Sequence, residues 1–308
     1  MSLNFKSGGQ RCAASLFRPA NTGLAPCVVM GHGFTGTRDQ LLPYVEAFTK
    51  AGFAVLTFDY RHFGESDGSP RQIVAVKKQM EDWRSAIALA RTLEGVDPKR
   101  IALWGSSLSG GHVINLGAED STFAAIVAQV PALDKSAHGM SEEAKAKMKR
   151  EGISLGSLIT VSLRSLAAAV DDQVQGLVGR SPHYMPVFGR PGEVAAFTDP
   201  EWEENLAFFT KAGPTWRNEF APRFLFSAPK YVKGTAERIQ MPLLVCVAEQ
   251  DTEANPALAI HIARKAPRGV LKIYAARHFE VYRGAVLQQM LSDQTAFLRR
   301  HLSTESAL

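Results

Sequence analysis

A short stretch at residues 101–114, IALWGSSLSGGHVI, joins an apolar run to a group of small and hydroxyl-bearing residues. A strand that ends in a Gly-x-Ser turn and continues directly into a helix exposes the serine hydroxyl at the strand end, where it can act as a nucleophile. Ser107 lies two residues after Gly105 and has the register of that turn. We therefore predict that Ser107 is the nucleophile of a serine-dependent reaction.

Two neighbouring serines are alternatives to Ser107. Ser109 is followed by Gly111, but a serine lies two residues before it where the turn needs a glycine. Ser106 has Trp104 at that preceding position, which is too bulky for a strained, tightly packed turn. Ser109 itself occupies the fifth position of the motif, where a second glycine usually stands. Serine is small enough for that position, so Ser106 and Ser109 are expected to pack in the turn or cap the helix.

An acid and a histidine follow two later apolar runs. Asp251 lies in EQDTEANP after PLLVCVA, and His278 lies in ARHFEVYRG after VLKIYA. Ligands of open α/β sheets bind beyond the carboxyl ends of the strands, so residues in these loops are expected to meet at one site. In such a triad the histidine takes the serine proton, and the aspartate orients the imidazole and stabilises its positive form.

Other acids and histidines compete for the last two positions. Asp251 is preferred because a carboxylate three residues beyond the strand end can reach back to a histidine in the next loop. Glu249 is the fallback, and Glu253 is the third acid of that loop. Three further histidines are expected to be structural: His32, His62 and His261.

Strand and helix patterns alternate along most of the chain. Short apolar runs without period-2 alternation are typical of strands that are buried on both faces of a parallel sheet. After a hairpin of LNFK and CAASLFR, such runs occupy 27–30, 54–58, 101–104, 123–130, 242–248 and 270–275. Helical patterns occupy 40–51, 73–93, 110–118, 254–265 and 285–301, and Asp97-Pro98 is expected to separate the second of these from the next strand. The order predicts an α/β fold with a doubly wound, mostly parallel, eight-stranded sheet.

The alternation stops between residues 134 and 238. This stretch is first rich in helix formers and then in proline, glycine and aromatic residues. We predict a mainly helical cap inserted over the carboxyl edge of the sheet, with a core formed by 1–133 and 239–308. Some of its aromatic residues would then form an apolar pocket above Ser107, and the others would form the cap's own core. They are Phe188, Phe197, Trp202, Phe208, Phe209, Trp216, Phe220, Phe224, Phe226 and Tyr231.

Composition narrows the function classes. The net charge is +5 in 308 residues, and the one basic cluster, KAKMKR at 145–150, follows two glutamates and is expected to be a solvated helix face. Cys12, Cys27 and Cys246 lie outside any CxxC or Cys/His metal spacing, which predicts no metal or cofactor and suits a reducing compartment. No apolar window resembles a signal peptide or a membrane span. We expect a cytoplasmic protein that binds neither nucleic acid nor a membrane.

Several motifs together resemble the α/β-hydrolase superfamily over nearly the whole chain, in particular bacterial esterases and peptidase-like hydrolases. They are HGF at 32–34, FDYRHFGESDG at 58–68, GSSLSGG at 105–111, VAEQD at 247–251 and RHFEVY at 277–282. The chain order Ser, Asp, His is that of this fold. The resemblance implies an oxyanion hole formed by the backbone N–H groups of Leu108 and Phe34.

Two of these motifs have alternative interpretations. GHGFTG is glycine-rich, but it lacks the Gly-Lys-Ser/Thr ending and the GxGxxG spacing of nucleotide loops, so nucleotide binding is not expected. In FDYRHFGESDG, Asp59 and Arg61 follow a strand end and could touch a substrate. The interpretation that we favour is a charged turn that braces the nucleophile loop.

Three functions are compatible with the sequence. The first is a serine hydrolase that cleaves carboxylic esters, thioesters or lactones of a moderately apolar small molecule. The second uses the same triad for amide or peptide hydrolysis, acyl transfer or C–C bond cleavage, and the third is a non-catalytic binding protein on the same fold. Enzymes with an aspartate nucleophile are disfavoured because position 107 is serine. The sequence leaves the individual ester and the oligomeric state, monomer or homodimer, undetermined.

Overall fold

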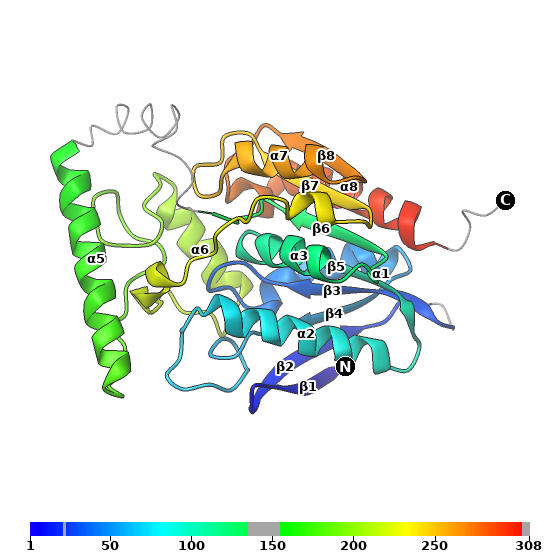
Figure 1. Ribbon diagram of the computed structural model, residues 1–308, viewed down its shortest axis with the longest axis horizontal. Helices are drawn as coiled ribbons and strands as arrows, with labels where there is room; N and C mark the ends of the chain where they lie inside the picture. Colours follow the sequence, from blue (N-terminus) through cyan, green and yellow to red (C-terminus); the bar gives the residue numbers. More distant parts are fainter. Residues whose placement is uncertain (21–22, 135–154, 304–308) are drawn as a thin grey trace.

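The computed structural model describes residues 1–20, 23–134 and 155–303 (Figure 1). The basic cluster at 145–150 lies outside the described residues. None of the helices in the described ranges combines the length and the apolar character that crossing a bilayer requires.

One eight-stranded sheet forms the centre of the molecule, with the order β1-β2-β4-β3-β5-β6-β7-β8. The first two strands pair antiparallel with each other, β2 pairs antiparallel with β4, and all other pairs are parallel. The predicted α/β fold with a mostly parallel, eight-stranded sheet is confirmed. The strands are β1 Ser2–Ser7, β2 Gln10–Phe17, β3 Ala25–Gly31, β4 Ala54–Phe58, β5 Val96–Ser106, β6 Ala125–Gln129, β7 Leu243–Ala248 and β8 Gly269–Tyr274.

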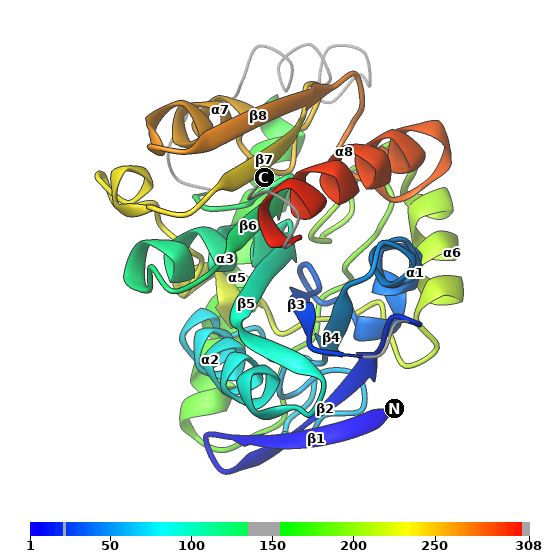
Figure 2. The ribbon, with the colours of Figure 1, turned by 90° about the vertical axis from the view of Figure 1, so that its right-hand side faces the viewer.

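Helices cover both faces of the sheet (Figure 2). One apolar cluster joins a face of the sheet to α2 Val76–Thr92, α3 Leu108–Glu119 and α7 Pro256–Lys265. A second cluster joins the opposite face to α1 Leu42–Lys50 and α8 Gly284–Leu302. Burial of β3, β4, β6 and β7 on both faces explains why their sequences are continuous apolar runs.

The helix predicted at 73–93 is observed as α2, and its buried face packs in the first of these clusters. Met80, Trp83, Ile87 and Ala90 are buried, as their helical spacing indicates. The prediction about the helix end was wrong in one detail. Helix α2 ends at Thr92, and β5 begins before Asp97-Pro98, because Val96 already pairs with Ala25 of β3 and the Asp97-Pro98 step lies in an irregular stretch of the strand.

Residues 155–238 contain α5 Leu155–Leu177 and α6 Trp202–Ala212, with the short 3-10 helices η2 Pro222–Phe226 and η3 Ala236–Arg238. Long loops connect them, and two isolated β-bridges, Met185 with Phe220 and Phe188 with Phe197, hold these loops together. A third apolar cluster forms here and extends to Phe34 and Phe279 of the sheet's own loops. The aromatic residues of this segment therefore pack directly against the loops that follow two strands.

Helix α5 lies at the periphery, and its inner face is fixed by a buried ion pair (Figure 1). Asp172 is fully buried and accepts two hydrogen bonds from the Arg223 guanidinium, at 2.7 Å each, with further bonds from the Arg223 and His183 amides. The outer face is an exposed apolar stripe of Leu163, Leu166, Val170, Val174 and Leu177. The bidentate pair therefore ties α5 directionally to η2.

We predict that Arg223→Ala lowers the free energy of unfolding by about 3 kcal/mol, because it leaves the buried Asp172 carboxylate without its cation. Urea unfolding measures the loss, and hydrogen exchange of α5 amides shows whether this helix opens first. The control is Arg217→Ala, which removes an exposed pair with Glu219 and should cost no more than about 0.5 kcal/mol. An equal loss of unfolding free energy in the two variants would show that the Arg223–Asp172 pair does not stabilise the protein more than an exposed pair does.

Candidate active site

Ser107 lies in a strained turn between β5 and α3. Its φ of 55° is in the left-handed region, which costs a non-glycine residue about 1–3 kcal/mol. The turn is held by its backbone, because the Ser107 amide donates to the Gln129 carbonyl and the Ser107 carbonyl accepts from Ala132, both at 2.9 Å. A Cβ atom at Gly105 would overlap the Ser109 carbonyl oxygen, so strand and helix approach too closely for any larger residue there.

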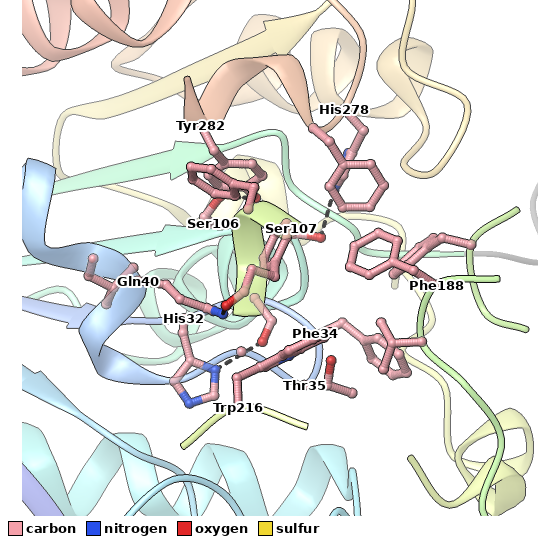
Figure 3. Close-up of a pocket in the computed structure, with 18 residues that line it drawn as sticks. His32, Phe34, Thr35, Gln40, Ser106, Ser107, Phe188, Trp216, His278 and Tyr282 are labelled. Atoms are coloured by element: carbon pink, nitrogen blue, oxygen red, sulfur yellow. Dashed lines mark hydrogen bonds between the residues drawn. The ribbon is translucent and has the colours of Figure 1, made fainter. Parts of the chain in front are cut away.

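The three residues of the predicted triad lie in one hydrogen-bonded line, of which Figure 3 shows the part between Ser107 and His278. His278 Nε2 is 3.1 Å from Ser107 Oγ, and His278 Nδ1 is 2.6 Å from Asp251 Oδ2. All three residues are buried, with exposed fractions of 3 to 7%. The structure thus brings together three side chains that are 171 and 27 residues apart in the chain.

Asp251 is fixed by its own loop. Its Oδ1 accepts hydrogen bonds from the Glu253 and Ala254 amides, both at 2.8 Å, which leaves Oδ2 for His278. The competing acids are unsuitable, since Glu249 is exposed and Glu253 is partly exposed. The two amide donors stabilise a carboxylate at this buried position.

The two rival serines are engaged elsewhere. The Ser106 hydroxyl is 2.8 Å from the Tyr282 hydroxyl and accepts a bond from the Gln129 side chain at 3.2 Å. The Ser109 hydroxyl donates to the backbone carbonyl of His32. Neither has a hydrogen bond to a histidine side chain among the described residues. The register argument for Ser107 therefore agrees with the geometry.

The HGF loop lies beside the nucleophile. A Cβ atom at Gly33 would lie 3.2 Å from Ser107 Cβ and 3.9 Å from Ser107 Oγ. Phe34 follows directly, and Leu108 is the first residue of α3, so its amide has no acceptor within the helix. The structure thus places both predicted oxyanion residues next to Ser107, and the positive end of the α3 dipole also points to this spot.

The FDYRHFGESDG motif forms ion pairs inside the protein. Asp59 pairs with Arg38, and Arg61 Nε donates to Asp82 at 2.7 Å. Neither Asp59 nor Arg61 lines the pocket at Ser107. The interpretation of these residues as a structural brace agrees with their contacts.

Three buried histidines are kept neutral. Burial lowers the pKa of His32 and lowers that of His62 to about 4, and each ring bonds a backbone carbonyl, that of Gly33 and Pro70 respectively. Burial also lowers the pKa of His112 to about 3, and its Nε2 is 2.9 Å from the Gln79 side-chain oxygen. His32 and His62 thus have the structural contacts that we expected.

A narrow pocket with a cavity volume of about 40 Å³ opens above Ser107 (Figure 3). Its walls are mainly aromatic and come from both the sheet loops and the 155–238 segment. The aromatic residues are Phe34, Phe188, Phe197, Phe208, Phe209, Trp216, Phe279 and Tyr282. Five of the ten aromatic residues that the sequence placed in the insertion line this pocket. The described residues contain no group of three or more His, Cys, Asp or Glu that could hold a metal ion.

Sequence reasoning missed Phe279 and Tyr282. Phe279 packs edge-on against His278 with ring centroids 5.0 Å apart, and also against Phe188 and Phe197. Both missed residues belong to RHFEVY, which was used only to find the histidine. Their aromatic character immediately after the histidine was the available signal. Phe34 packs against three rings of the 155–238 segment, those of Phe197, Phe220 and Phe224.

A protein-family comparison matches residues 28–287 to the model described as the alpha/beta hydrolase family. The chain belongs to the alpha/beta hydrolase family. Solved structures agree on the fold: DcsB, in complex with its substrate analogue, superposes with a TM-score of 0.77 at 22% identity, covering 98% of this chain and 99% of its own. The alpha/beta hydrolase GrgF from Penicillium superposes with a TM-score of 0.76 at 22% identity, covering 98% of both chains.

Among similar proteins, the quorum-quenching protein AidA of Acinetobacter baumannii is 34% identical over 302 residues, which are 97% of this chain and 94% of AidA. The polyketide transferase af380 of Aspergillus fumigatus is 27% identical over 90% of both chains. The thiohydrolase aneE of Aspergillus aculeatus is 36% identical over 62% of this chain and 58% of its own. The similar family members thus include hydrolases and transferases by name.

We predict that stability falls as the pH drops below 6.5, because an unfolded chain protonates His112 while the folded protein holds it neutral down to about pH 3. His112 alone is expected to contribute a loss of roughly 1.4 kcal/mol per pH unit within that window, and the buried His32 and His62 add to the slope in the same direction. Urea unfolding at pH 7.5 and pH 5 measures it. His112→Gln should reduce the pH dependence, and His261→Gln, at an exposed position on α7, should leave it unchanged. An identical slope in wild type and His112→Gln would refute this prediction.

Proposed function

We propose that the protein is a serine hydrolase that cleaves carboxylic esters, including thioesters or lactones, of a moderately apolar small molecule through an acyl-enzyme intermediate. The observation that carries the proposal is the buried line from Ser107 Oγ through His278 to Asp251, at 3.1 and 2.6 Å, beneath an aromatic pocket. Burying three polar groups costs free energy, and apolar side chains would fill these positions without that cost. The line therefore supports a catalytic role.

The reaction follows from the contacts. Ser107 Oγ attacks the carbonyl carbon while its proton passes to His278 Nε2, and the carbonyl π electrons move to the oxygen. The resulting oxyanion accepts hydrogen bonds from the Phe34 and Leu108 amides, and each of these bonds lowers the barrier by on the order of 3 kcal/mol. His278 then returns its proton to the leaving oxygen or sulfur as the bond to carbon breaks. Water, deprotonated by His278, attacks the acyl carbon; the bond from that carbon to Ser107 Oγ then breaks, His278 returns the proton to Ser107 Oγ, and the acid is released.

Acyl transfer to an acceptor other than water is the second candidate. The specific observation that favours it is the likeness to the polyketide transferase af380 over 90% of both chains. An apolar pocket that admits little water also favours an alcohol or amine as the attacking group. The first half of the reaction, up to the acyl-enzyme, is the same in both candidates.

Residues 134–238 would form the cap over this site, since the described part supplies Phe188, Phe197, Phe208, Phe209 and Trp216 to the pocket. Three buried thiols, free of disulfide bonds, suit a cytoplasmic location.

Three buried polar atoms of pocket residues have no hydrogen-bond partner among the described residues: His32 Nε2, Thr35 Oγ1 and Trp216 Nε1. An indole N–H can only donate, so it requires an acceptor. We therefore propose that the substrate carries, besides its scissile carbonyl, a second oxygen that accepts a hydrogen bond in this pocket.

We predict that the wild type hydrolyses p-nitrophenyl esters and that Ser107→Ala lowers kcat/KM by at least about 10³-fold, since the nucleophile is lost. Mass spectrometry after reaction with a fluorophosphonate probe should find the adduct on Ser107 in the wild type. Ser106→Ala, the adjacent hydroxyl control, should still be labelled.

The remaining outcomes separate the candidates. An adduct with slow hydrolysis, but with fast turnover when alcohols or amines are added, would favour the transferase. A folded wild type that gives neither adduct nor turnover would overturn the proposed function in favour of a binding protein.

The role of Trp216 is tested by Trp216→Phe, which keeps an aromatic ring and removes the N–H. We expect kcat/KM to fall about 5- to 20-fold for the p-nitrophenyl ester of 4-oxo- or 5-oxohexanoate, as a lost hydrogen bond implies, and to change less than about twofold for plain hexanoate. Trp202→Phe, outside the pocket lining, is the matched control. Equal effects on the oxo and plain esters would show that Trp216 does not recognise a substrate oxygen.

A further inference from the structure

Ser109 departs from the family pattern, and its contacts suggest a purpose. The glycine that usually stands at this position allows strand and helix to approach closely. Here Gly105 alone meets that need, because the point of contact is the backbone carbonyl of residue 109 and not its side chain. The Ser109 side chain is therefore free to point away from the strand, where it is completely buried.

The Ser109 hydroxyl is the middle of a hydrogen-bonded chain. Its oxygen lies within hydrogen-bond distance of the His32 backbone carbonyl and of the Tyr60 hydroxyl, and Trp83 Nε1 lies 2.6 Å from that hydroxyl. The directions are fixed by chemistry. The His32 carbonyl can only accept, so Ser109 donates to it. The Trp83 indole can only donate, so Tyr60 accepts from it, and because the Ser109 proton is engaged with His32, Tyr60 donates its own hydrogen bond to Ser109.

This chain ends on the loop that carries the proposed oxyanion donor. His32 begins the HGF loop, and Phe34, whose amide we assign to the oxyanion hole, follows two residues later. Gly33 between them lies against Ser107. A hydrogen bond to the His32 carbonyl thus fixes the loop at one end, and the aromatic contacts of Phe34 with Phe220 and Phe224 fix it at the other.

Burial makes the chain rigid. Tyr60, Trp83 and Ser109 are each fully buried, and His32 is 1% exposed. Without the Ser109 hydroxyl, the Tyr60 proton and the His32 carbonyl would both lose a partner in a region from which water is excluded, and the loop would have to move to recover one.

We propose that Ser109 is a positioning residue, which sets the place of the Phe34 amide relative to Ser107 through the His32 carbonyl. The proposal rests on the serine-hydrolase function proposed above. Since Ser109 belongs to the helix that begins with Leu108, one rigid unit would position both oxyanion donors, Leu108 directly and Phe34 through this hydrogen bond. Tyr60 and Trp83 support Ser109 from the side of α2.

The test compares Ser109→Ala and Ser109→Gly with the wild type. We expect kcat on a p-nitrophenyl ester to fall about 10- to 100-fold with KM changed less than about threefold, because a displaced oxyanion donor affects the transition state more than the bound ester. The inhibition constant of an alkylboronic acid, which forms a tetrahedral adduct with the serine, should rise by a similar factor. The pH midpoint of kcat/KM should not move, since His278 and Asp251 are untouched.

A matched control distinguishes positioning from a general loss of stability. Ser7→Ala also removes a buried hydroxyl, which bonds Arg61 at 2.7 Å on the edge strand β1, four strands away from β5 in the sheet. It should lower the urea midpoint and leave kcat and the boronate constant within about twofold of the wild type. Tyr60→Phe, which leaves the bond from Ser109 to His32 in place, should give a smaller fall in kcat, about three- to fivefold.

The outcomes are separable. If Ser109→Ala is folded and its kcat and boronate constant stay within twofold of the wild type, Ser109 is only a packing residue and the inference is wrong. If Ser109→Ala does not fold, Tyr60→Phe decides: an unchanged kcat and boronate constant overturn the inference, and a parallel change in both supports it. A wild type without turnover or fluorophosphonate adduct would instead refute the proposed function itself.

Discussion

The backbone at Ser107 is the constraint on which the site depends. A serine with φ of 55° sits at the junction of β5 and α3, and hydrogen bonds to Gln129 and Ala132 from the next strand end hold it there. The helix must approach the strand so closely at this junction that residue 105 can only be glycine. As a result, the Ser107 hydroxyl lies beneath the pocket, and the amide of Leu108, the first residue of α3, lies beside it without an acceptor in the helix. Backbone strain of this kind persists only where the surrounding structure fixes the conformation, and here the fully buried central strands do so.

A second level of organisation is aromatic. Phe34 follows the residue that faces the nucleophile, and Phe279 follows the histidine, and both rings pack into the cluster formed by residues of the 155–238 segment. The segment that lines the pocket is thus the same one that fixes the two loops flanking Ser107. A change in its packing would therefore alter both the shape of the pocket and the position of the reacting groups.

Hydrogen-bonded side chains complete the support behind the pocket. In the turn between β5 and α3, the Ser106 hydroxyl forms a hydrogen bond with the Tyr282 hydroxyl, and the Ser109 hydroxyl donates one to the His32 carbonyl. The two serines that compete with Ser107 in the sequence are thus its braces, each tied to a loop that carries a proposed catalytic group. The GSSLS motif accordingly places the Ser107 hydroxyl, which lines the pocket, between two hydroxyls that are held in structural hydrogen bonds.

Sequence alone was sufficient for the fold, and it proposed three triad residues whose side chains lie within hydrogen-bonding distance in the structure. Strands that are buried on both faces have continuous apolar sequences, which can be recognised locally. The nucleophile turn needs a glycine two residues before its serine, and residues 101–111 contain both an apolar strand end and this spacing. The placement of Asp251 and His278 after successive strands also follows from chain order, because parallel strands end at one edge. Their hydrogen-bonding distances agree with that expectation.

The tertiary structure alone decided which groups support those three residues. Nothing in the order of residues links Ser109 with Tyr60 and Trp83, or Phe279 with Phe188, because these contacts form only when α2, α3 and the 155–238 segment pack on the sheet. Which five of the ten aromatic residues line the pocket was equally undetermined, since an apolar side chain lowers its free energy by burial in any core. A local pattern specifies a turn or a strand, whereas a contact between distant segments depends on the geometry of packing.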